Sequence, residues 1–233
     1  MLTNRCNLTC AHCCFSCTAE GEDMSTEVVD AALSFAKANR SRIVLGGGEP
    51  TLHPRFDDIL RDAIASNTSR DTIGVVTNGT IEETALRLAA MDKRDVTAAL
   101  SYDQFHDHSA VSDKVRLAFG KLYPTRMEKI ADQGRAKKND LSPYPSDRYR
   151  ICLGSPCGGL HVLPDGRIYG CVCDDAPLFG RIQDSCDVPA GWMDGQCSFV
   201  DRHLALLASR PQPVWHRHPL VRDTLAILGY ISG

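Results

Sequence analysis

The stretch Arg42-Ile43-Val44-Leu45-Gly46-Gly47-Gly48-Glu49-Pro50 has the pattern of a short apolar strand that ends in a glycine-rich turn. Working outward from it, the sequence predicts a helix over residues 25–39, with Asp23 or Ser25 as its N-cap. A second helix is predicted after the turn, because Pro54 suits a first helical turn and apolar residues follow it at helical spacing. The quoted stretch is therefore the strand of a helix–strand–helix unit.

The same alternation continues to about residue 120. Strands are predicted over residues 72–77 and 95–100, and helices over about 81–91 and 107–119. Repeated βα units with short connections indicate parallel strands flanked by helices, which places the chain in the α/β class. In such folds the reactive groups gather at the C-terminal ends of the strands. Here those ends carry polar or glycine-rich turns, at residues 46–49, 78–79 and 101–103.

Length and composition narrow the class of protein further. A chain of 233 residues is long enough for one α/β domain with a small appendage, and 43% hydrophobic with 24% charged residues is ordinary for a soluble globular protein. No apolar run is long enough to span a bilayer, and the first residues lack the apolar stretch of a signal peptide. We therefore expect a cytoplasmic location. The net charge of −3 argues against a polyphosphate partner over the whole surface.

The cysteine content is the unusual feature of the composition. Disulfides are not expected in a reducing compartment, where clustered cysteines indicate metal or redox chemistry. The 11 cysteines form two groups, Cys6, Cys10, Cys13, Cys14 and Cys17 near the start and Cys152, Cys157, Cys171, Cys173, Cys186 and Cys197 later. This distribution predicts two metal sites on two structural units.

The first group contains the spacing C-x3-C-x2-C at Cys6, Cys10 and Cys13. Three thiolates on one tight loop can hold three irons of a [4Fe–4S] cube, whose usual complement is four cysteines. The fourth iron is then open to a ligand, as catalytic metal sites require. Structural zinc is the alternative for cysteines at such short spacing.

Cys10, Cys14 and Cys17 repeat this spacing in a second, overlapping register. The first register is preferred because His12, which has a flat ring, precedes its third cysteine, whereas Ser16 precedes the third cysteine of the other register. Cys14 and Cys17 are then expected to be spare or buried thiols, the ordinary state of a cysteine.

The loop resembles the C-x3-C-x-aromatic-C signature of radical S-adenosylmethionine (SAM) enzymes, which follows the first strand in that family. The resemblance continues, in order, with Gly47–Gly48–Glu49–Pro50, Thr77–Asn78–Gly79–Thr80 and Ser101–Tyr102–Asp103, and covers about residues 1–135. It implies a partial (β/α) barrel that cleaves SAM reductively to methionine and a 5′-deoxyadenosyl radical. That radical removes hydrogen from an unactivated C–H bond, while the protein supplies positioning and excludes water.

The resemblance also implies a role for each matching residue. Cys6, Cys10 and Cys13 would hold the cluster, and the open iron would chelate the amino and carboxylate groups of SAM. The candidates for SAM binding are His12 at the adenine or cluster edge, Gly47, Gly48 and Glu49 near the methionyl ammonium, Asn78, Ser101 and Asp103 at the ribose and carboxylate, and Arg135 at a carboxylate. Asp103 and His106 are the candidate catalytic residues, although a histidine near a helix start is more often a cap or a surface residue.

The second cysteine group resembles the C-x(9–15)-G-x4-C opening of SPASM or twitch extensions, which carry auxiliary [4Fe–4S] clusters. Asp165–Gly166 between alternating apolar residues predicts a β-hairpin here. The expected metal ligands are Cys152, Cys157, Cys171 and Cys173, with Cys186, Cys197, Cys14 and Cys17 still possible. The run of four close cysteines that completes a SPASM domain is absent, which favours one auxiliary cluster. Structural zinc and free thiols remain open.

We therefore predict a partial, abbreviated (β/α) barrel over residues 1–139 and a small cysteine-rich extension with a β-hairpin over 140–200. A helical tail is predicted over 201–233, with its helix at about 217–229. The stretch after residue 119 is too short for full fifth and sixth βα units. The barrel is expected to be open, so that a large substrate or a partner chain could close it.

Several functions are compatible with this pattern. A peptide or amino-acid-like substrate is the first hypothesis, because many family members with such extensions act on ribosomal peptides. Recognition would then need another protein, because no leader-binding segment precedes the barrel. A nucleotide or modified base is the second hypothesis, to which the basic residues over 202–222 lend some support. The third is a non-catalytic iron–sulfur or zinc module. The resemblance also implies an electron donor of the flavodoxin or ferredoxin type.

Overall fold

The computed structural model describes residues 1–68, 72–91, 93–127, 130, 133–141, 160–170, 178–184, 186 and 188. They belong to the first of two compact units, Met1–Gln196, and the second unit is Cys197–Gly233. Most of the linker expected over 140–150 and the helix expected at 217–229 lie outside the described residues. No helix of the described part is both long and apolar enough to cross a membrane.

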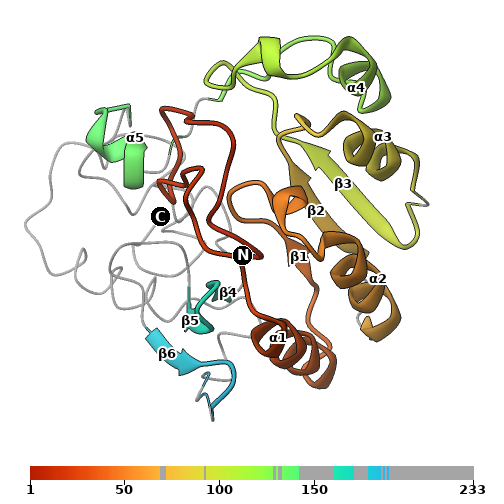
Figure 1. The fold of residues 1–233 in the computed structure, drawn as a ribbon, viewed down its shortest axis with the longest axis vertical. Helices are drawn as coiled ribbons and strands as arrows, with labels where there is room; N and C mark the ends of the chain where they lie inside the picture. Colours follow the sequence, from red (N-terminus) through yellow and green to blue (C-terminus); the bar gives the residue numbers. More distant parts are fainter. Residues whose placement is uncertain are drawn as a thin grey trace, which may run out of the picture. The chain divides into compact units, whose positions relative to one another are not determined.

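A parallel sheet forms the centre of the described structure (Figure 1). Its strands β1 (Val44–Leu45), β2 (Ile73–Thr77) and β3 (Val96–Leu100) lie in the order β1-β2-β3. Both neighbouring pairs are parallel. The three strands predicted from the sequence are therefore confirmed, although β1 is shorter than expected. The α/β class is confirmed with them.

Single parallel bridges extend this sheet at both edges. Thr3 pairs with Gly47 beside the C-terminal end of β1, and Asp103 pairs with Thr125 beyond β3. The N-terminal residues thus take the place of the first strand that the resemblance implies. The second bridge shows that only a vestige of a further strand follows β3 among the described residues. Curvature into a partial barrel remains a prediction.

The helices begin and end at residues with identifiable caps. Helix α1 (Thr26–Ala38) begins after Ser25, whose side chain accepts a hydrogen bond from the Val28 N–H, so one of the two expected caps is confirmed. Helix α2 (Phe56–Ser66) follows a 3-10 turn, η1 (Pro50–Leu52). The sequence predicted Pro54 in the first turn of this helix, but α2 begins at Phe56 and Pro54 lies in the turn before it. Helix α3 (Glu82–Ala90) agrees with its predicted range.

The helix predicted over 107–119 is divided into two pieces. A 3-10 turn, η2 (His108–Ala110), comes first and helix α4 (Asp113–Ala118) follows. The Asp107 carboxylate accepts a bond from the Ser109 N–H, and the Ser112 hydroxyl accepts one from the Val115 N–H. These two side chains start separate helical segments, because each satisfies an N–H that a continuous helix would bond to a carbonyl. Helix α5 (Gly134–Lys138) is the next described helix.

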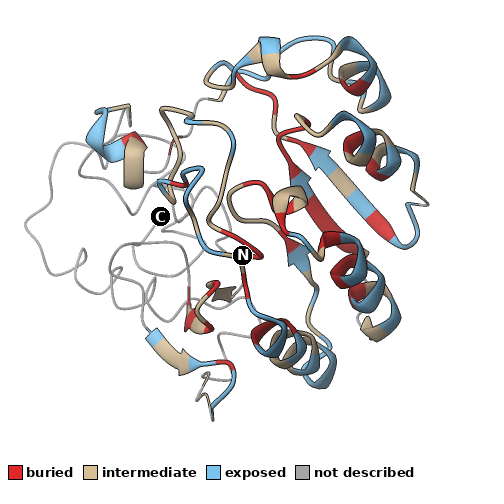
Figure 2. Ribbon diagram, viewed as in Figure 1, coloured by how far each residue is buried: buried red, intermediate tan, exposed pale blue. Residues whose placement is uncertain are grey.

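One face of the parallel sheet is buried under α1, α2 and α3 (Figure 2). The core on this face contains Leu45, Ile73, Val75 and Val96 from the strands and Val28, Val29, Phe56, Ile59, Leu60, Ala63 and Leu88 from the helices. Strand residues that point the other way are more accessible, and Val44 and Val76 are 52% and 41% exposed. The sheet therefore has one covered and one open face.

The predicted hairpin is also present. Strands β4 (His161–Val162) and β5 (Arg167–Tyr169) are antiparallel, and Gly166 in their turn has a φ of +85°. A strand that was not predicted, β6 (Leu178–Arg181), pairs with β5. Ile168 and Ile182 join the same core as the parallel sheet. Cys152, Cys157, Cys171, Cys173 and Cys197 lie outside the described residues, so the auxiliary ligand set remains a prediction.

Candidate metal centre and cofactor site

The cysteine loop, residues 6–17, begins and ends at one point of the fold. The Cys6 N–H donates to the Thr18 carbonyl at 2.7 Å, and Arg5 forms a parallel bridge with Thr18. The Arg5 guanidinium also forms an ion pair with Asp23 at 2.7 Å. The loop is therefore closed at its base by the polypeptide itself.

The glycine-rich turn after β1 fixes the loop to the C-terminal edge of the sheet. The Gly48 N–H donates to the Thr3 carbonyl at 2.8 Å, and the Glu49 N–H donates to the Arg5 carbonyl at 2.9 Å. A Cβ on Gly47 would lie 2.2 Å from the Thr3 carbonyl oxygen, and one on Gly48 would lie 2.2 Å from that of Arg5. Gly47 also has a φ of +142°, which favours glycine. Both glycines are thus required by the packing of the N-terminal segment.

The thiols of this loop differ in their accessibility. Cys6, Cys10, Cys13 and Cys14 are partly exposed, whereas Cys17 is buried. Burial raises the pKa of Cys14 to about 11. A hydrogen bond from the Cys17 thiol outweighs burial and lowers the pKa of Cys13 to about 5. Cys17 is accordingly the protonated member of this pair, because its hydrogen bond to Cys13 and its burial raise its pKa.

These thiols fit the iron–sulfur cluster that the resemblance implies. Burial raises the pKa of Cys6, and the Glu49 carboxylate and the sulfurs of Cys10 and Cys13 raise it further, because each carries negative charge when ionised. The Leu8 N–H contacts the Cys6 Sγ at 3.4 Å. Thiolates that crowd together and accept N–H groups are suitable ligands for a positively charged iron core.

The Glu49 carboxylate is wholly buried and fully engaged with the protein. Oε1 accepts from the Thr51 N–H, the Thr51 hydroxyl and the Thr77 hydroxyl at 3.2, 2.7 and 2.8 Å. Oε2 accepts from the Asn78 N–H at 2.6 Å. Burial raises the pKa of Glu49, although these bonds oppose the rise. The side chain ties the turn after β1 to the end of β2, so the structure gives Glu49 a role in holding the site together.

Asn78 comes directly after β2 and lies against the cysteine loop. Its Nδ2 donates to the Asn7 Oδ1 at 2.9 Å and contacts the Cys6 Sγ at 3.9 Å. Asn7 in turn donates to the Thr80 hydroxyl at 2.7 Å. The sequence did not single out Asn7, because a polar residue between two cysteines carries no signal of its own.

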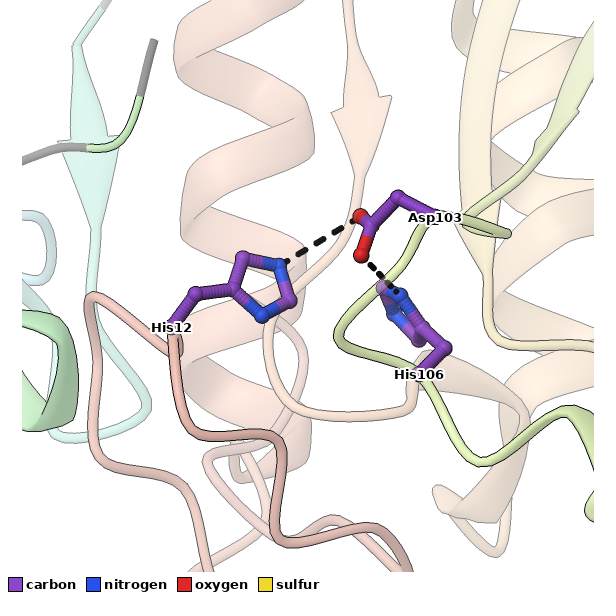
Figure 3. A group of neighbouring side chains, drawn as sticks. All are labelled: His12, Asp103 and His106. Carbon is purple, nitrogen blue, oxygen red and sulfur yellow. Dashed lines mark ion pairs between the residues drawn. The ribbon is translucent and has the colours of Figure 1, made fainter. Parts of the chain in front are cut away.

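His12, Asp103 and His106 meet beside the loop (Figure 3). The Asp103 carboxylate lies between the two imidazoles, 3.5 Å from His12 Nε2 and 3.0 Å from His106 Nδ1. The three side chains are only 14%, 6% and 9% exposed. His12 also stacks on Phe105, with ring centroids 4.9 Å apart. The loop after β3, which contains Asp103 and His106, thus contacts the cysteine loop through His12.

This group has shifted proton affinities. Burial opposes ionisation of Asp103, but hydrogen bonds from His106 and His12 hold its pKa well below the usual range. Burial also opposes protonation of His106, but hydrogen bonds to Asp103 and Cys10 raise its pKa to about 9. The three donor atoms lie within 4.8 Å of one another, a separation that a single divalent ion could use. Since His106 also contacts Cys10, the group belongs to the environment of the cysteine loop.

Arg135 holds the far side of the cysteine loop. Its Nε donates to the Cys10 carbonyl at 3.0 Å and its guanidinium also donates to the Cys17 carbonyl at 2.7 Å. Its backbone N–H donates to the Cys13 carbonyl at 2.9 Å, and Asn139 donates to the Ala11 carbonyl at 3.0 Å. The sequence predicted that the Arg135 guanidinium binds a carboxylate. In the structure it binds backbone carbonyls of the cysteine loop instead.

The described structure thus brings together the predicted residues from five segments: the cysteine loop, the turn after β1, the end of β2, the loop after β3 and the segment of Arg135. Ser101 follows β3 and its N–H donates to the Thr77 carbonyl at 2.8 Å, which places it at the same sheet edge as Asn78. The roles of these residues toward SAM remain predictions, because their positions establish neighbourhood and not binding.

The model of the Radical SAM superfamily matches residues 1–132, which is more than half of the chain. The chain belongs to the radical SAM superfamily. Cleavage of SAM to a radical, with a [4Fe–4S] cluster and a reductant, follows from this membership. The prediction of an enzyme of this family from the cysteine loop and the glycine-rich turn is confirmed, whereas the SPASM-like extension is not established.

Relatives within the superfamily differ in their named functions. The chain is 36% identical over 114 residues to "Probable GTP 3',8-cyclase" of Methanocella arvoryzae, a match over 45% of this chain and 34% of that protein. It is 34% identical over 103 residues to "Mycofactocin maturase MftC" of Mycobacterium tuberculosis, over 42% of this chain and 26% of that protein. The matched region thus spans about a third or less of the length of these relatives.

A third relative comes from Pyrococcus furiosus. The chain is 37% identical over 87 residues to the "Tungsten-containing aldehyde ferredoxin oxidoreductase cofactor-modifying protein", a match over 34% of this chain and 23% of that protein. The three names describe three different outcomes. The matched region therefore does not distinguish between substrates.

Proposed function

We propose that Cys6, Cys10 and Cys13 hold the cluster of this radical SAM enzyme and that its radical abstracts hydrogen from a peptide or amino-acid-like substrate. The observation that carries the proposal is the fixation of the cysteine loop to the sheet edge. A Cβ on Gly48 would lie 3.1 Å from the Cys6 Cβ, so the first thiol is packed directly on the glycine-rich turn. Cysteines held in this way have one orientation relative to the polar ends of β2 and β3.

The choice of cysteine register is supported by how readily the thiols ionise. Burial raises the pKa of Cys14 to about 11, and for Cys17 its hydrogen bond to Cys13 and then burial raise the pKa. Cysteines bind an iron–sulfur cluster as thiolates, so a thiol that resists ionisation is a poorer ligand. The first register is therefore the one proposed, with Cys17 as a protonated neighbour that donates to Cys13.

The chain's own residues would position SAM and exclude water. When bound, the cluster supplies one electron to the sulfonium of SAM. Asn78, Ser101 and Asp103 follow β2 and β3 at one sheet edge, where they would lie near the ribose and carboxylate of SAM. Gly47 and Gly48 leave only backbone beside the loop, which allows the methionyl group a close approach. Phe105 stacks on His12, and this ring pair would help to keep water away from the reaction.

Two classes of substrate are considered, a peptide and a nucleotide. The relative named as a mycofactocin maturase supports a peptide, and the open sheet face with Val44 and Val76 offers room for a large substrate. A nucleotide is the second candidate, because the chain is similar to proteins named GTP 3',8-cyclase. In either case, the catalytic candidates among the described residues are Asp103 and His106.

We also propose an auxiliary [4Fe–4S] cluster in a twitch-like extension over residues 140–200, with ligands among Cys152, Cys157, Cys171 and Cys173. The hairpin of β4 and β5 supports the extension. A flavodoxin or ferredoxin type of protein would supply the electron, and the cytoplasm, which keeps thiols reduced, is the expected location.

Anaerobic reconstitution tests the first cluster. The chain is loaded with iron and sulfide, reduced with dithionite and supplied with SAM, and 5′-deoxyadenosine is measured. A triple variant, Cys6→Ala, Cys10→Ala and Cys13→Ala, should form none, whereas a Cys14→Ala, Cys17→Ala variant should retain most of the activity. Equal product from the triple variant and the wild type would refute the assignment. Iron of about eight per chain indicates two cubes, and about four indicates one.

Deuterium transfer tests the substrate. GTP deuterated on the ribose and peptides deuterated at their side chains, taken from reading frames beside the gene, are incubated separately with the reconstituted enzyme and SAM. Deuterium in 5′-deoxyadenosine from a peptide supports the first proposal. Transfer from GTP alone overturns it in favour of the nucleotide.

A further inference from the structure

The orientation of the Asn78 side chain is fixed by its neighbour. The Asn78 Oδ1 accepts from the Thr80 N–H at 3.0 Å and from the Thr80 hydroxyl at 2.8 Å. A backbone N–H can only donate, so the atom that meets it must be the amide oxygen. The Asn78 Nδ2 therefore has to point the other way, toward the cysteine loop.

On that side the Nδ2 meets two acceptors of the cysteine loop. One is the Asn7 Oδ1 at 2.9 Å and the other is the Cys6 Sγ at 3.9 Å. Asn7 is itself held by the Thr80 hydroxyl at 2.7 Å, which closes a ring of three side chains. Asn78 is 6% exposed, so water competes little for these bonds.

The Cys6 Sγ accepts hydrogen bonds from two directions. It receives the Leu8 N–H at 3.4 Å from within the loop, and the Asn78 amide reaches it from the end of β2. Hydrogen bonds to ligand sulfurs withdraw negative charge from an iron–sulfur cluster and favour its reduced form. The sheet thus contributes a donor that the loop alone cannot supply.

We propose that Asn78 is a positioning residue of the metal centre, which donates an N–H···S bond to Cys6 and raises the reduction potential of the cluster. The inference rests on the proposed ligand set. In this role the Asn78 Nδ2 contacts a ligand of the cluster, whereas the sequence predicted a contact with the ribose or carboxylate of SAM. Thr80 and Asn7 keep the donor pointed at the sulfur.

The test is a redox titration of the reconstituted protein, followed by the electron paramagnetic resonance signal of the reduced cluster. Asn78→Asp keeps the shape and the acceptor for Thr80 but places an anionic oxygen at the sulfur. It should make reduction about tenfold less favourable, which is about 59 mV for one electron. Asn139→Asp is the matched control, because Asn139 is exposed and donates to the carbonyl of Ala11 in the same loop. Its potential should remain that of the wild type.

A second variant keeps the inference testable if Asn78→Asp assembles no cluster. Thr80→Val removes the hydroxyl that orients Asn78 and Asn7 without changing any charge, and it should lower the potential by a smaller amount. Potentials of Asn78→Asp or, failing that, Thr80→Val that equal the wild-type value overturn the inference. A wild-type protein that binds iron without any signal of a [4Fe–4S] cluster overturns the proposed function instead.

Discussion

The described part of the chain contains two three-stranded sheets that are stabilised in different ways. In the parallel sheet the decisive contacts join distant segments, such as Glu49 with Asn78 and Gly48 with Thr3. In the antiparallel sheet they join near neighbours, such as Asp165 with Arg167 at 2.6 Å. The parallel sheet holds the cysteine loop at its C-terminal edge, whereas the antiparallel sheet contains the short turn between β4 and β5.

The difference follows from how each topology places its loops. In a parallel sheet the loops after successive strands meet at one edge, so residues from far-apart segments can share a site. Every contact there depends on the correct approach of two backbones. A hairpin needs only its own turn residues, so its contacts tolerate change. Substitutions should therefore cost more at the parallel edge than in the hairpin, and the following variants test this difference.

The largest effect is expected for Gly48→Ala. The added methyl would overlap the Arg5 carbonyl, so the N-terminal segment must move away from the sheet edge. We expect a loss of about 3 kcal/mol in the free energy of unfolding and little iron after reconstitution. Urea unfolding and iron analysis measure both. Gly46→Ala is the control, since a Cβ there meets nothing within 4 Å. Equal stability of the two variants would show that the close approach of Gly48 to Arg5 does not constrain this edge.

Glu49→Ala comes second. It leaves the N–H groups of Thr51 and Asn78 without their acceptor in a buried site, at a cost of about 2 kcal/mol in the free energy of unfolding. Thermal unfolding of the variant and the wild type measures the loss. A cost below that of the hairpin variant Asp165→Asn would contradict the proposed importance of this long-range contact.

Glu49→Gln tests the same carboxylate through its pH dependence. Burial raises the pKa of Glu49 in the folded chain above its ordinary value of 4.5, so the folded chain holds more protons than the unfolded chain between those two values. The free energy of unfolding of the wild type should therefore fall as pH rises through this window. Glu49→Gln should lack this contribution. Parallel slopes in urea unfolding at several pH values would contradict it.

Arg135→Gln should have a moderate effect. It removes the guanidinium bonds to the Cys10 and Cys17 carbonyls, worth about 1 kcal/mol each. The loop should then release iron several-fold faster to a chelator, measured by the absorbance of the chelate. Lys138→Gln, on the exposed side of the same short helix, is the control. Equal release rates in both variants would show that Arg135 does not hold the loop.

The smallest effect is expected for Asp165→Asn in the hairpin. The ion pair with Arg167 is partly exposed, and such pairs contribute less than about 1 kcal/mol. Iron content and 5′-deoxyadenosine formation should equal those of the wild type. A loss of iron in this variant would mean that the hairpin supports the metal centre more closely than its local contacts indicate.

The sequence predicts the elements well where the local pattern decides them. The strands ending at Thr77 and Leu100, the Ser25 cap and the turn at Gly166 all have local causes, and each is present. Strand β6 was missed because Leu178–Arg181 contains a glycine and lacks a clear alternation. The division of the segment 107–119 was missed because apolar spacing does not show which side chains cap a helix.

The candidate site is predictable in its location and less so in its contacts. The cysteine spacing and the turns after each strand indicate which residues gather, because parallel topology brings them to one edge. They do not indicate which atoms meet. Arg135 bonds to carbonyls more than 100 residues earlier in the chain, and Glu49 is saturated by donors from β2 and the following turn. Such pairings depend on tertiary packing that no local pattern contains.

The closed base of the cysteine loop has a consequence for maturation. Cys6 is hydrogen-bonded to Thr18, and Arg5 is paired with Asp23. The two ends of the cysteine loop are therefore held together by the protein itself. These contacts predict that binding iron and sulfide orders the ends of the loop little further, so that little conformational entropy is lost in that step. An enzyme stripped of its inorganic core by oxygen would then keep a receptive scaffold, ready for repair without passage through the unfolded state.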